Sequence, residues 1–338
     1  MAIDIASLGE FGLIDRITEP FALKHPESLK GPGDDAAVID TGNALTLVST
    51  ELLLEGIHFD LVYTPLAHLG YKTVVAGISD IYAMNGTPRQ ITVAIGLSAR
   101  FGVEQVDELY KGIRIACDKY DIDLVGGDTS ASLTGLTLGV TAIGTVEKEK
   151  IVYRSGAREH DLICVTGDLG SAYLGLKLLD REKRVLEGVE NPQPKFEGYE
   201  YLLQRQLKPD AQKLAIDSMA AGGIVPTAMI DLSDGLASDL LQVCKASKMG
   251  ARVYLDRIPI AKETFALAEE LNIDPVVAAL NGGDDYELLF TIPVTQQKEV
   301  ANIPGAEIIG HIVPESKGCT LNTPDGQDIA LSSPGFAI

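Results

Sequence analysis

Residues 31–38 read GPGDDAAV, and the rest of the chain repeats the pattern of this stretch. The Gly-Pro-Gly start predicts a rigid turn, because proline fixes φ and glycine permits positive φ and a close approach of a ligand. Two adjacent carboxylates, Asp34 and Asp35, follow the turn directly. Alone, such a pair is typical of a cap or a solvated loop tip, so its meaning depends on similar sites elsewhere.

Further aspartates beside glycine or other small residues follow apolar runs: Asp80, Asp128, Asp231, Asp234 and the pair Asp284–Asp285. Each one has a plain structural alternative as a turn cap, a helix cap or a loop residue. If several converge, carboxylates about 6 Å apart repel by roughly 3 kcal/mol at an effective dielectric constant of about 20, so cations are needed. Hard oxygen ligands favour Mg²⁺, which also binds substrate phosphates. Convergence is a hypothesis, since spacing along the chain does not establish it.

Composition limits the classes of function. The 338 residues carry a formal net charge of −20, and 46% of them are hydrophobic. These values predict about two globular domains that bind neither nucleic acid nor a membrane, and that need cations to hold phosphates. The start of the chain lacks the features of a signal peptide, and no apolar run is long enough to span a membrane. Four separated cysteines predict reduced thiols and a cytoplasmic location.

Several common catalytic motifs are missing from the sequence. It contains no GxxxxGK[ST] phosphate loop, no GxGxxG after a strand, no HExxH and no GxSxG. The five histidines also lack zinc-ligand spacing. Nucleotide binding through a phosphate loop, zinc chemistry and serine hydrolysis are therefore poor explanations of the acidic pattern.

Hydrophobic periodicity predicts an α+β protein with domains at 1–148 and 149–338, divided at the charged segment 147–150. In the first half we expect helices at 10–17, 65–84 and 103–120, and strands at 36–40, 45–50, 90–98, 124–127 and 136–146. In the α/β second half we expect strands at 161–166, 227–231, 252–255, 287–292 and 307–312, and helices after 170, at 209–219 and 235–247, and from 262 and 295. Strands 90–98 and 136–146 are apolar on both faces, so helices should cover one face and a second subunit the other.

The motifs, taken in order, resemble those of the thiamine-monophosphate kinase family in the AIR synthase-related (PurM-like) ATP-binding superfamily. They are GEF at Gly9 with Leu13-Ile14, GDDAAV at Gly33, Ser49-Thr50 before GIHF at Gly56, Ser79-Asp80 with Ala83-Met84, LVGGDT at Leu124, RSGA at Arg154, IDLSDGL at Ile230 and GGDDYEL at Gly282. The resemblance implies a β-rich N-terminal domain that dimerises through its sheet and a C-terminal α/β domain, with ATP between them.

The resemblance also assigns roles to residues. It implies ligation of several Mg²⁺ ions by Asp35, Ser49, Thr50, Asp80, Asp128, Asp231 and Asp234, with Glu51 as a further ligand. It implies ATP contacts by Tyr110, Gly127, Asp128, Arg154 and Ser233, and thiamine-phosphate contacts by His58, Asp284 and Phe336. Asp35, Asp128 and Arg154 become the catalytic candidates. Three positions depart from the family pattern: Glu51 replaces Asp, Asp284 replaces Glu, and Phe336 stands where Tyr or Trp is frequent.

Other roles remain open for four of these residues. Arg154 can form a salt bridge at the domain junction, and His58 can be a packed or capping histidine. Tyr110 is by default a core residue of its helix. Phe336 can either stack on a thiamine ring or fill the core near the C-terminus.

The implied reaction converts ATP and thiamine monophosphate into ADP and thiamine diphosphate. Its acceptor is an anionic phosphate oxygen, so no general base is needed, and catalysis rests on positioning and charge neutralisation. One alternative is another enzyme of the superfamily, of the selenophosphate synthetase, hydrogenase-maturation dehydratase or aminoimidazole ribonucleotide synthetase type. The first cysteine at Cys117 and the final residues Gly335–Ile338 disfavour the first two of these. A catalytically silent metal-binding scaffold is the other alternative.

Overall fold

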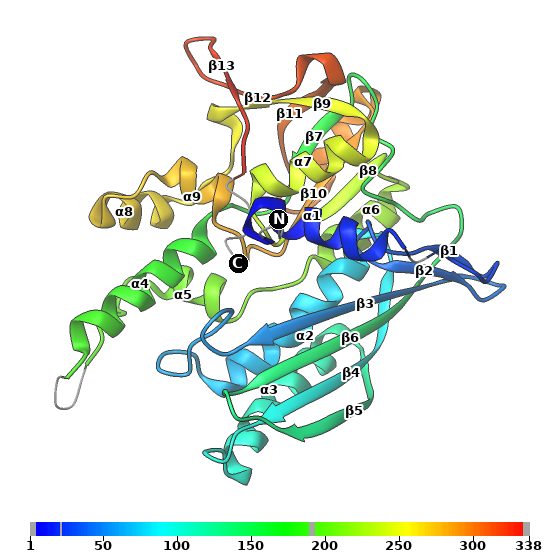
Figure 1. The fold of residues 1–338 in the computed structure, drawn as a ribbon. Helices are drawn as coiled ribbons and strands as arrows, with labels where there is room; N and C mark the ends of the chain where they lie inside the picture. Colours follow the sequence, from blue (N-terminus) through cyan, green and yellow to red (C-terminus); the bar gives the residue numbers. More distant parts are fainter. Residues whose placement is uncertain (1–4, 21, 189–192, 334–338) are drawn as a thin grey trace.

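The computed structural model describes residues 5–20, 22–188 and 193–333, and Figure 1 shows that two β-sheets frame its fold. In chain order, the first half of the chain comprises α1 (Ile5–Thr18), β1 (Ser28–Lys30), β2 (Ala37–Asp40), β3 (Leu45–Leu54), α2 (Leu66–Ala83), β4 (Thr87–Leu97), α3 (Val103–Tyr120), β5 (Asp123–Ala131) and β6 (Thr137–Val146). The chain then passes to the second sheet, which begins at Leu162.

The second sheet and its helices follow in this order. They are β7 (Leu162–Val165), α4 (Ser171–Leu186), α5 (Glu200–Leu207), α6 (Lys213–Gly222), β8 (Ala228–Leu232), α7 (Leu236–Ser247), β9 (Met249–Tyr254), η1 (Leu255–Arg257), α8 (Lys262–Leu271), α9 (Pro275–Asn281), β10 (Glu287–Ile292), η2 (Val294–Asn302), β11 (Glu307–Pro314), η3 (Glu315–Lys317), β12 (Cys319–Asn322) and β13 (Asp328–Ala330). The fold is therefore α+β, with two mixed sheets.

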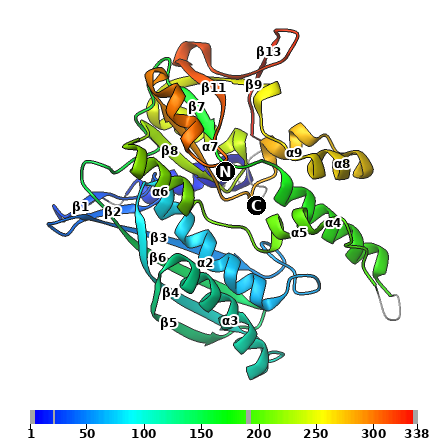
Figure 2. The same ribbon diagram turned by 180° about the vertical axis from the view of Figure 1, so that it is seen from behind.

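The N-terminal sheet has one covered face and one open face. Its strand order is β1-β2-β3-β6-β4-β5, and only the β4–β5 pair is parallel. Along β3, Leu45, Leu47 and Ser49 are buried toward the helices, while Thr50 and Leu52 are exposed on the opposite, outer face. Figure 2 shows α2 and α3 lying against the inner face of this sheet.

Helix α2 connects the two halves of the molecule. Pro65 precedes its first turn, where the missing N–H of proline costs nothing. Tyr71 and Ile78 of α2 belong to one buried cluster that also includes Val140 of the first sheet and Met229 and Phe290 of the second. Because this helix packs on both sheets, its polar residues lie at the junction between the two domains.

The C-terminal sheet has the order β13-β12-β9-β11-β7-β10-β8, which places β8 and β10 at one edge. Strand β8 is in contact with α2, so its end lies near the first domain. Leu236, Leu240 and Val243 of α7 form a second core with this sheet. Leu174, Leu202 and Leu267 unite α4, α5 and α8 in a smaller core beside it (Figure 1).

Most of the predicted elements are confirmed. Helix α3 and strand β10 have the predicted bounds, and helix α2 matches within one residue at each end. Strand β5 is longer than predicted, running from Asp123 to Ala131. Helix α1 is also longer, since it begins at Ile5.

Two predicted helices are wrong in part, and several short elements were missed. Residues 209–212 are not helical, because the Ala211 N–H donates to the Tyr120 hydroxyl at 2.9 Å instead of joining a helix. The segment from Thr295 forms 3₁₀ turns. The missed elements are β1, α5, α9, β12 and β13, all of eight residues or fewer. Such short elements depend on tertiary packing more than on local sequence pattern.

In the described part of the chain, every helix is too short or too polar to cross a membrane.

Candidate active site

Three aspartates from distant parts of the sequence meet at the domain junction. Asp35 precedes β2, Asp80 lies near the end of α2, and Asp231 lies in β8. One carboxylate oxygen from each of the three lies within 4.8 Å of the others. The predicted convergence of separate acidic motifs therefore occurs for these three residues, which we call the acidic cluster.

Asp35 is the most constrained member of the acidic cluster. Its Oδ1 accepts hydrogen bonds from Arg154 Nε at 3.1 Å and Nη2 at 2.7 Å, whereas its buried Oδ2 has no hydrogen-bond partner among the described residues. Burial raises the pKa of Asp35 to about 7, although Arg154 acts against this shift. The Arg154 backbone N–H also donates to Asp34 at 3.0 Å. Arg154 therefore forms a salt bridge at the domain junction, the alternative that its sequence position left open.

Serine hydroxyls orient the other two members. The Ser49 hydroxyl donates to Asp80 Oδ2, and the Ser79 hydroxyl donates to Asp231 Oδ2 at 2.6 Å. Burial raises the pKa of Asp80 well above its ordinary value, and the nearby Asp231, Glu51 and Asp35 carboxylates add to this effect. Burial also raises the pKa of Asp231 to about 6, against the Ser79 hydrogen bond and Arg154.

The acidic cluster has the chemistry of a divalent-cation site. At an effective dielectric constant of about 20, two ionised carboxylates at such a separation repel by about 3 kcal/mol. Among the residues that the structure describes, Arg154 is the cation that contacts the cluster directly. The unpartnered Oδ2 of Asp35 and the hydroxyl of Ser49 offer further hard oxygen atoms. This donor set fits Mg²⁺, which prefers carboxylate oxygens and keeps open positions for phosphate.

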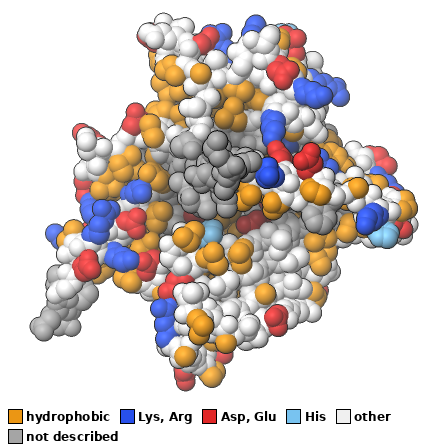
Figure 3. Space-filling view, in the orientation of Figure 1, with side chains coloured by type: hydrophobic (Ala, Val, Ile, Leu, Met, Phe, Trp, Pro, Cys, Tyr) orange, Lys and Arg blue, Asp and Glu red, His pale blue; other side chains and the backbone are white. Residues whose placement is uncertain are grey.

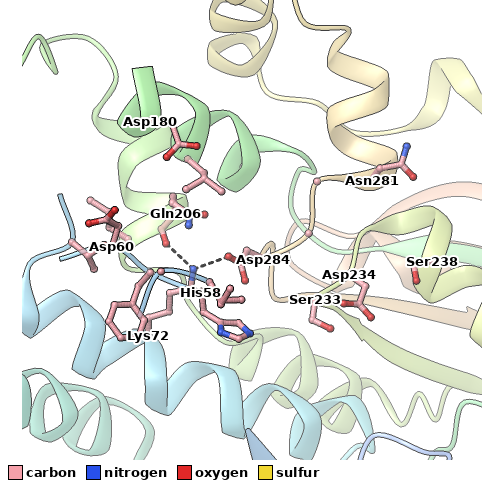
Figure 4. A pocket seen from close by; sticks show the side chains of 18 of the residues that line it. His58, Asp60, Lys72, Asp180, Gln206, Ser233, Asp234, Ser238, Asn281 and Asp284 are labelled. Atoms are coloured by element: carbon pink, nitrogen blue, oxygen red, sulfur yellow. Dashed lines mark hydrogen bonds and ion pairs between the residues drawn. The ribbon is translucent and has the colours of Figure 1, made fainter. Parts of the chain in front are cut away.

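A large cavity lies between the two domains, and it is lined by Ser233 and Asp234, which follow Asp231 closely in the chain. Its volume is about 730 Å³, and its lining includes His58, Lys72, Ser233, Asp234 and Asp284. Figure 4 shows these side chains facing one another from the loop after β3, from α2, from the loop before α7 and from the loop before β10. The structure thus brings together His58 and Asp284, which were predicted to bind one substrate.

Asp234 and Ser233 occupy the loop between β8 and α7. Gly235 follows with φ of 103°, which only glycine adopts readily, so the chain turns sharply into α7. The Asp234 N–H donates to Asp239 Oδ2 at 3.2 Å, which holds this loop against the helix. Burial raises the pKa of Asp234 above its ordinary value.

His58 is arranged as a neutral hydrogen-bond donor. The Leu54 N–H donates to His58 Nδ1 at 3.0 Å, so in the neutral imidazole the proton is on Nε2. Partial burial lowers the pKa of His58, although Asp284 acts against this shift. Near neutral pH, His58 can therefore donate from Nε2 without carrying a charge.

Asp284 sits in a loop with unusual backbone geometry. Gly283, Asp284 and Tyr286 have φ values of 72°, 61° and 51°, in the left-handed region. Short polar side chains such as Asp tolerate this region better than most residues, which gives a physical reason for Asp in place of Glu. Burial opposes ionisation, but Lys72 and several hydrogen bonds hold the pKa of Asp284 below its usual value. Asp284 is thus an anion in the cavity wall.

A second cleft, of about 550 Å³, lies between β5 and α3 and is lined by Tyr110, Gly127 and Asp128. A side chain at position 127 would clash, since its Cβ would lie 2.0 Å from the Val93 carbonyl oxygen. The structure therefore places three of the predicted ATP-binding residues together, but in a cleft separate from the one that contains Ser233.

Asp128 and Thr50 are not part of the acidic cluster in the single chain. In the sheet register, Asp128 pairs with Ala94, and Ala94 is aligned through β6 with Leu52 of β3. Asp128 therefore lies three strands from Leu52, or roughly 14 Å at the usual strand spacing. Thr50 is exposed on the outer face, where its hydroxyl is 3.1 Å from that of Thr141. Their roles as metal ligands stay predictions, as does that of Glu51, which lies close enough to Asp80 to raise its pKa.

Sequence reasoning missed several residues of the cavity, among them Lys72 and Gln206. Lys72 carried a signal, because it is a charged residue within the otherwise apolar run of a helix. Phe11, from the GEF motif that had no assigned role, also lines the cavity. The predicted substrate residue Phe336 lies outside the described residues, so its role stays a prediction.

Comparison with known proteins identifies the class to which this fold and site belong. The models "AIR synthase related protein, N-terminal domain" and "AIR synthase related protein, C-terminal domain" match residues 33–146 and 158–319. The chain is therefore an AIR synthase-related protein with a two-domain PurM-like fold. Hydrogenase maturation protein HypE of E. coli, at 18% identity and a TM-score of 0.70 over 96% of this chain and 98% of that one, shares the fold.

Curated relatives give a narrower assignment. The chain is 34% identical over 289 residues to the thiamine-monophosphate kinase of Aquifex aeolicus, covering 86% of this chain and 87% of the relative. It is 35% identical over 321 residues to that of Buchnera aphidicola subsp. Schizaphis graminum, covering 92% and 93%. The solved structure "AaThiL complexed with AMPPCP and TMP" matches with a TM-score of 0.82 at 31% identity, covering 97% of each chain. The chain belongs to the thiamine-monophosphate kinase family.

Proposed function

We propose that this chain transfers the γ-phosphoryl group of ATP to thiamine monophosphate, releasing ADP and thiamine diphosphate. Besides membership of the family, one structural observation supports this proposal. Asp234 lines one cavity together with His58 and Asp284, and it lies close enough to Asp231 of the acidic cluster to raise the pKa of that carboxyl. A site for metal-bound phosphates therefore lies beside a site for a second, smaller substrate.

The chain's own residues act by positioning and by neutralising charge. The acceptor phosphate oxygen is already anionic, so the reaction needs no group that removes a proton from it. His58 donates a hydrogen bond from Nε2, and Asp284 offers a carboxylate to a cationic or N–H-bearing part of the acceptor. Arg154 holds Asp35 in place and adds a positive charge beside the transferring group. These contacts align the two reactants.

Asp35, Asp80 and Asp231, with the Ser49 hydroxyl, are the residues that would hold Mg²⁺ in this site. When bound, Mg²⁺ would supply neutralisation of charge between two anionic reactants. Asp234 raises the pKa of Asp231, and Glu51 raises that of Asp80, which supports both residues as further ligands. The unpaired thiols of all four cysteines support a reducing, cytoplasmic location.

We also propose that the active protein is a homodimer that pairs through the outer face of the N-terminal sheet. Leu52, Leu124 and Val125 are 56%, 43% and 56% exposed on or beside this face. Figure 3 shows mostly hydrophobic and uncharged groups over these strands. A second copy would cover them and would bring its own Asp128 and Tyr110 toward Thr50. The ATP site would then combine residues of both copies, which accounts for the two separate clefts of the single chain.

Mixing two inactive variants tests this dimer. If Asp128 acts across the interface with Asp35 of the other copy, an equal mixture of Asp35→Asn and Asp128→Asn chains, unfolded and refolded together, regains activity. Half of the dimers are then mixed and one of their two sites is intact, so roughly a quarter of the wild-type rate returns. No recovery, or a monomer in sedimentation velocity, would contradict this arrangement.

The function itself is tested by supplying purified protein with ATP, Mg²⁺ and a panel of acceptors, and by separating the products chromatographically. The proposal predicts that thiamine diphosphate and ADP form in equal amounts from thiamine monophosphate, and that thiamine and inorganic phosphate are poor acceptors. A protein that binds Mg²⁺ and ATP but forms no thiamine diphosphate would favour the silent scaffold or another activity of the superfamily.

A further inference from the structure

Lys72 is buried in the wall of the cavity, and nothing so far assigns it a role in the reaction. It lies in the second turn of α2 and is 5% exposed, and it is the one described lysine in the buried class. Its Nζ donates to Asp284 Oδ2 at 2.9 Å and to the Gln206 carbonyl oxygen at 3.1 Å (Figure 4). An ammonium group has three N–H donors. Among the described contacts, one donor therefore stays available for a ligand in the cavity.

The burial of this ammonium group needs a reason. Removing a lysine charge from water is costly unless strong partners replace the water. Within the described part of the chain, Lys72 has one carboxylate partner, and the side chain of that partner, Asp284, is itself 37% exposed. A salt bridge contributes little to stability when its carboxylate lies at the edge of a solvent-filled space. The arrangement instead presents a preorganised cation to whatever enters the cavity.

The position of Lys72 on α2 relates it to the acidic cluster. Ser79, which donates to Asp231, lies seven residues further along the same helix. Seven residues make almost two full turns, so both side chains share one face and are separated by about 10 Å along the axis. The helix thus presents a fixed cation at one end of the site and the carboxylates that suit Mg²⁺ at the other. With Mg²⁺ bound by the carboxylates, a phosphate group between these ends would have positive charge on both sides.

We infer that Lys72 binds the phosphate group of the acceptor and selects phosphorylated over unphosphorylated thiamine. The inference rests on the proposed function and extends it, because it names the contact that recognises the acceptor's anion. Asp284 holds the ammonium in place before the acceptor arrives and stays beside it afterwards. The charge-assisted N–H···O bond also offsets negative charge while the acceptor oxygen attacks the γ-phosphorus.

The cavity contains a matched control for this residue. Lys183 also lines it, but its ammonium pairs with Asp60 instead of Asp284, and its side chain is 44% exposed. Both lysines contribute one positive charge to the same cavity. They differ in burial and in distance from Asp284, so a general electrostatic effect should be shared by both, whereas a specific phosphate contact should belong to Lys72 alone.

The experiment compares the binding of thiamine monophosphate and thiamine by calorimetry, with Mg²⁺ present and ATP absent. Lys72→Met should weaken thiamine monophosphate binding by about 10- to 100-fold, the usual effect of one charged hydrogen bond. Its binding of thiamine should change less than about twofold. Lys72→Arg, which keeps the charge, should recover most of the loss, and Lys183→Met should leave the ratio of the two affinities unchanged.

Other outcomes overturn the inference. An equal loss for both ligands would make Lys72 a positioning residue for Asp284, and a selective loss in Lys183→Met would assign the phosphate contact to Lys183. If Lys72→Met fails to fold, the double variant Lys72→Met/Asp284→Asn avoids the unpaired carboxylate, and its ratio of the two affinities should fall in the same way. A wild-type chain that does not bind thiamine monophosphate would refute the proposed function itself, a result distinct from each of these.

Discussion

Neutralising one member of the acidic cluster should stabilise the metal-free protein while it abolishes activity. Asp231→Asn is the most informative change, because Asn has nearly the same shape as Asp and keeps an oxygen that can accept the Ser79 hydrogen bond. The variant removes one of three carboxylates that lie within 4.8 Å of one another. In the absence of metal, the wild-type protein must tolerate the repulsion among these groups.

Burial and charge repulsion both oppose the ionisation of Asp231 in the folded, metal-free protein, and each is of similar size. Burial raises the pKa of Asp231 from 3.8 to about 6, and a shift of this size corresponds to roughly 3 kcal/mol in the free energy of unfolding once the group is fully ionised. Coulomb's law at an effective dielectric constant of about 20 gives about 3 kcal/mol for one pair of such carboxylates. Asp231→Asn should therefore raise the melting temperature of the metal-free protein by roughly 4 °C at pH 8.

The dependence on pH follows from the direction of the pKa shift. Below about pH 4, Asp231 is protonated in both the folded and the unfolded wild-type protein, so the variant gains nothing. As the pH rises, the unfolded state loses this proton first, and the folded wild-type protein loses stability until the group ionises in the folded state as well. The stabilisation by Asp231→Asn should thus grow between pH 4 and pH 7 and then stay constant.

Thermal unfolding followed by circular dichroism in EDTA, at pH 4.5 and pH 8, tests this prediction. Asp256→Asn, at an exposed position outside the cavity, is the control and should leave the melting temperature unchanged. Millimolar Mg²⁺ should stabilise the wild-type protein more than Asp231→Asn, since only the wild type keeps all three carboxylates. A variant that is destabilised at pH 8, or stabilised equally at both pH values, would refute the account of a repulsive, cation-binding cluster.

Further variants test other parts of the site. Asp35→Asn and Asp128→Asn should each abolish Mg²⁺-dependent turnover without changing the circular dichroism spectrum, and a normal rate in either would remove that residue from the metal assignment. Glu51→Ala should raise the Mg²⁺ concentration needed for half-maximal rate, and an unchanged Mg²⁺ dependence would exclude it as a ligand. Phe11→Trp would introduce a single tryptophan into a chain that has none, and its emission should change when thiamine monophosphate enters the cavity that Phe11 lines. Phe265 is half exposed on α8, so the emission of Phe265→Trp should not change and serves as the control. Equal changes in the two variants would show that position 11 does not report the entry of the substrate.

Local sequence pattern predicted the parts of the fold that local interactions determine. Helix α2 begins after Pro65, and helix α3 repeats apolar residues at helical spacing, so both were found at nearly their observed bounds. The short helices α5 and α9 have too few residues to show a period. Strands β12 and β13 are four and three residues long. Elements of this size form because neighbouring parts of the chain support them.

The candidate site shows a similar division. The sequence identified Asp35, Asp80 and Asp231 by their small-residue contexts, but only the packing of α2 against both sheets brings them within reach of one metal ion. The same sequence pattern includes Asp128, whose position in the edge strand β5 keeps it away from the cluster in one chain. Strand pairing and subunit assembly determine which aspartates reach the cluster, and local sequence pattern predicts neither of them.

Lys72 illustrates what a motif-based prediction omits. Its neighbours in the sequence are apolar or small, and it belongs to no acidic or glycine-rich motif. Its role depends on Asp284 and Gln206, which lie 212 and 134 residues further along the chain. A charged residue among apolar residues of a helix can be recognised in the sequence, but its partner becomes known only from the three-dimensional structure.

Transfer of a labelled phosphoryl group tests the central claim most directly. Wild-type protein with Mg²⁺, thiamine monophosphate and ATP labelled at the γ-phosphorus should place the label in the terminal phosphate of thiamine diphosphate, with one unlabelled ADP formed for each product molecule. Asp231→Asn, although more stable without metal, should transfer no label. Label released as inorganic phosphate, label absent from thiamine diphosphate, or equal transfer by both proteins would contradict the account.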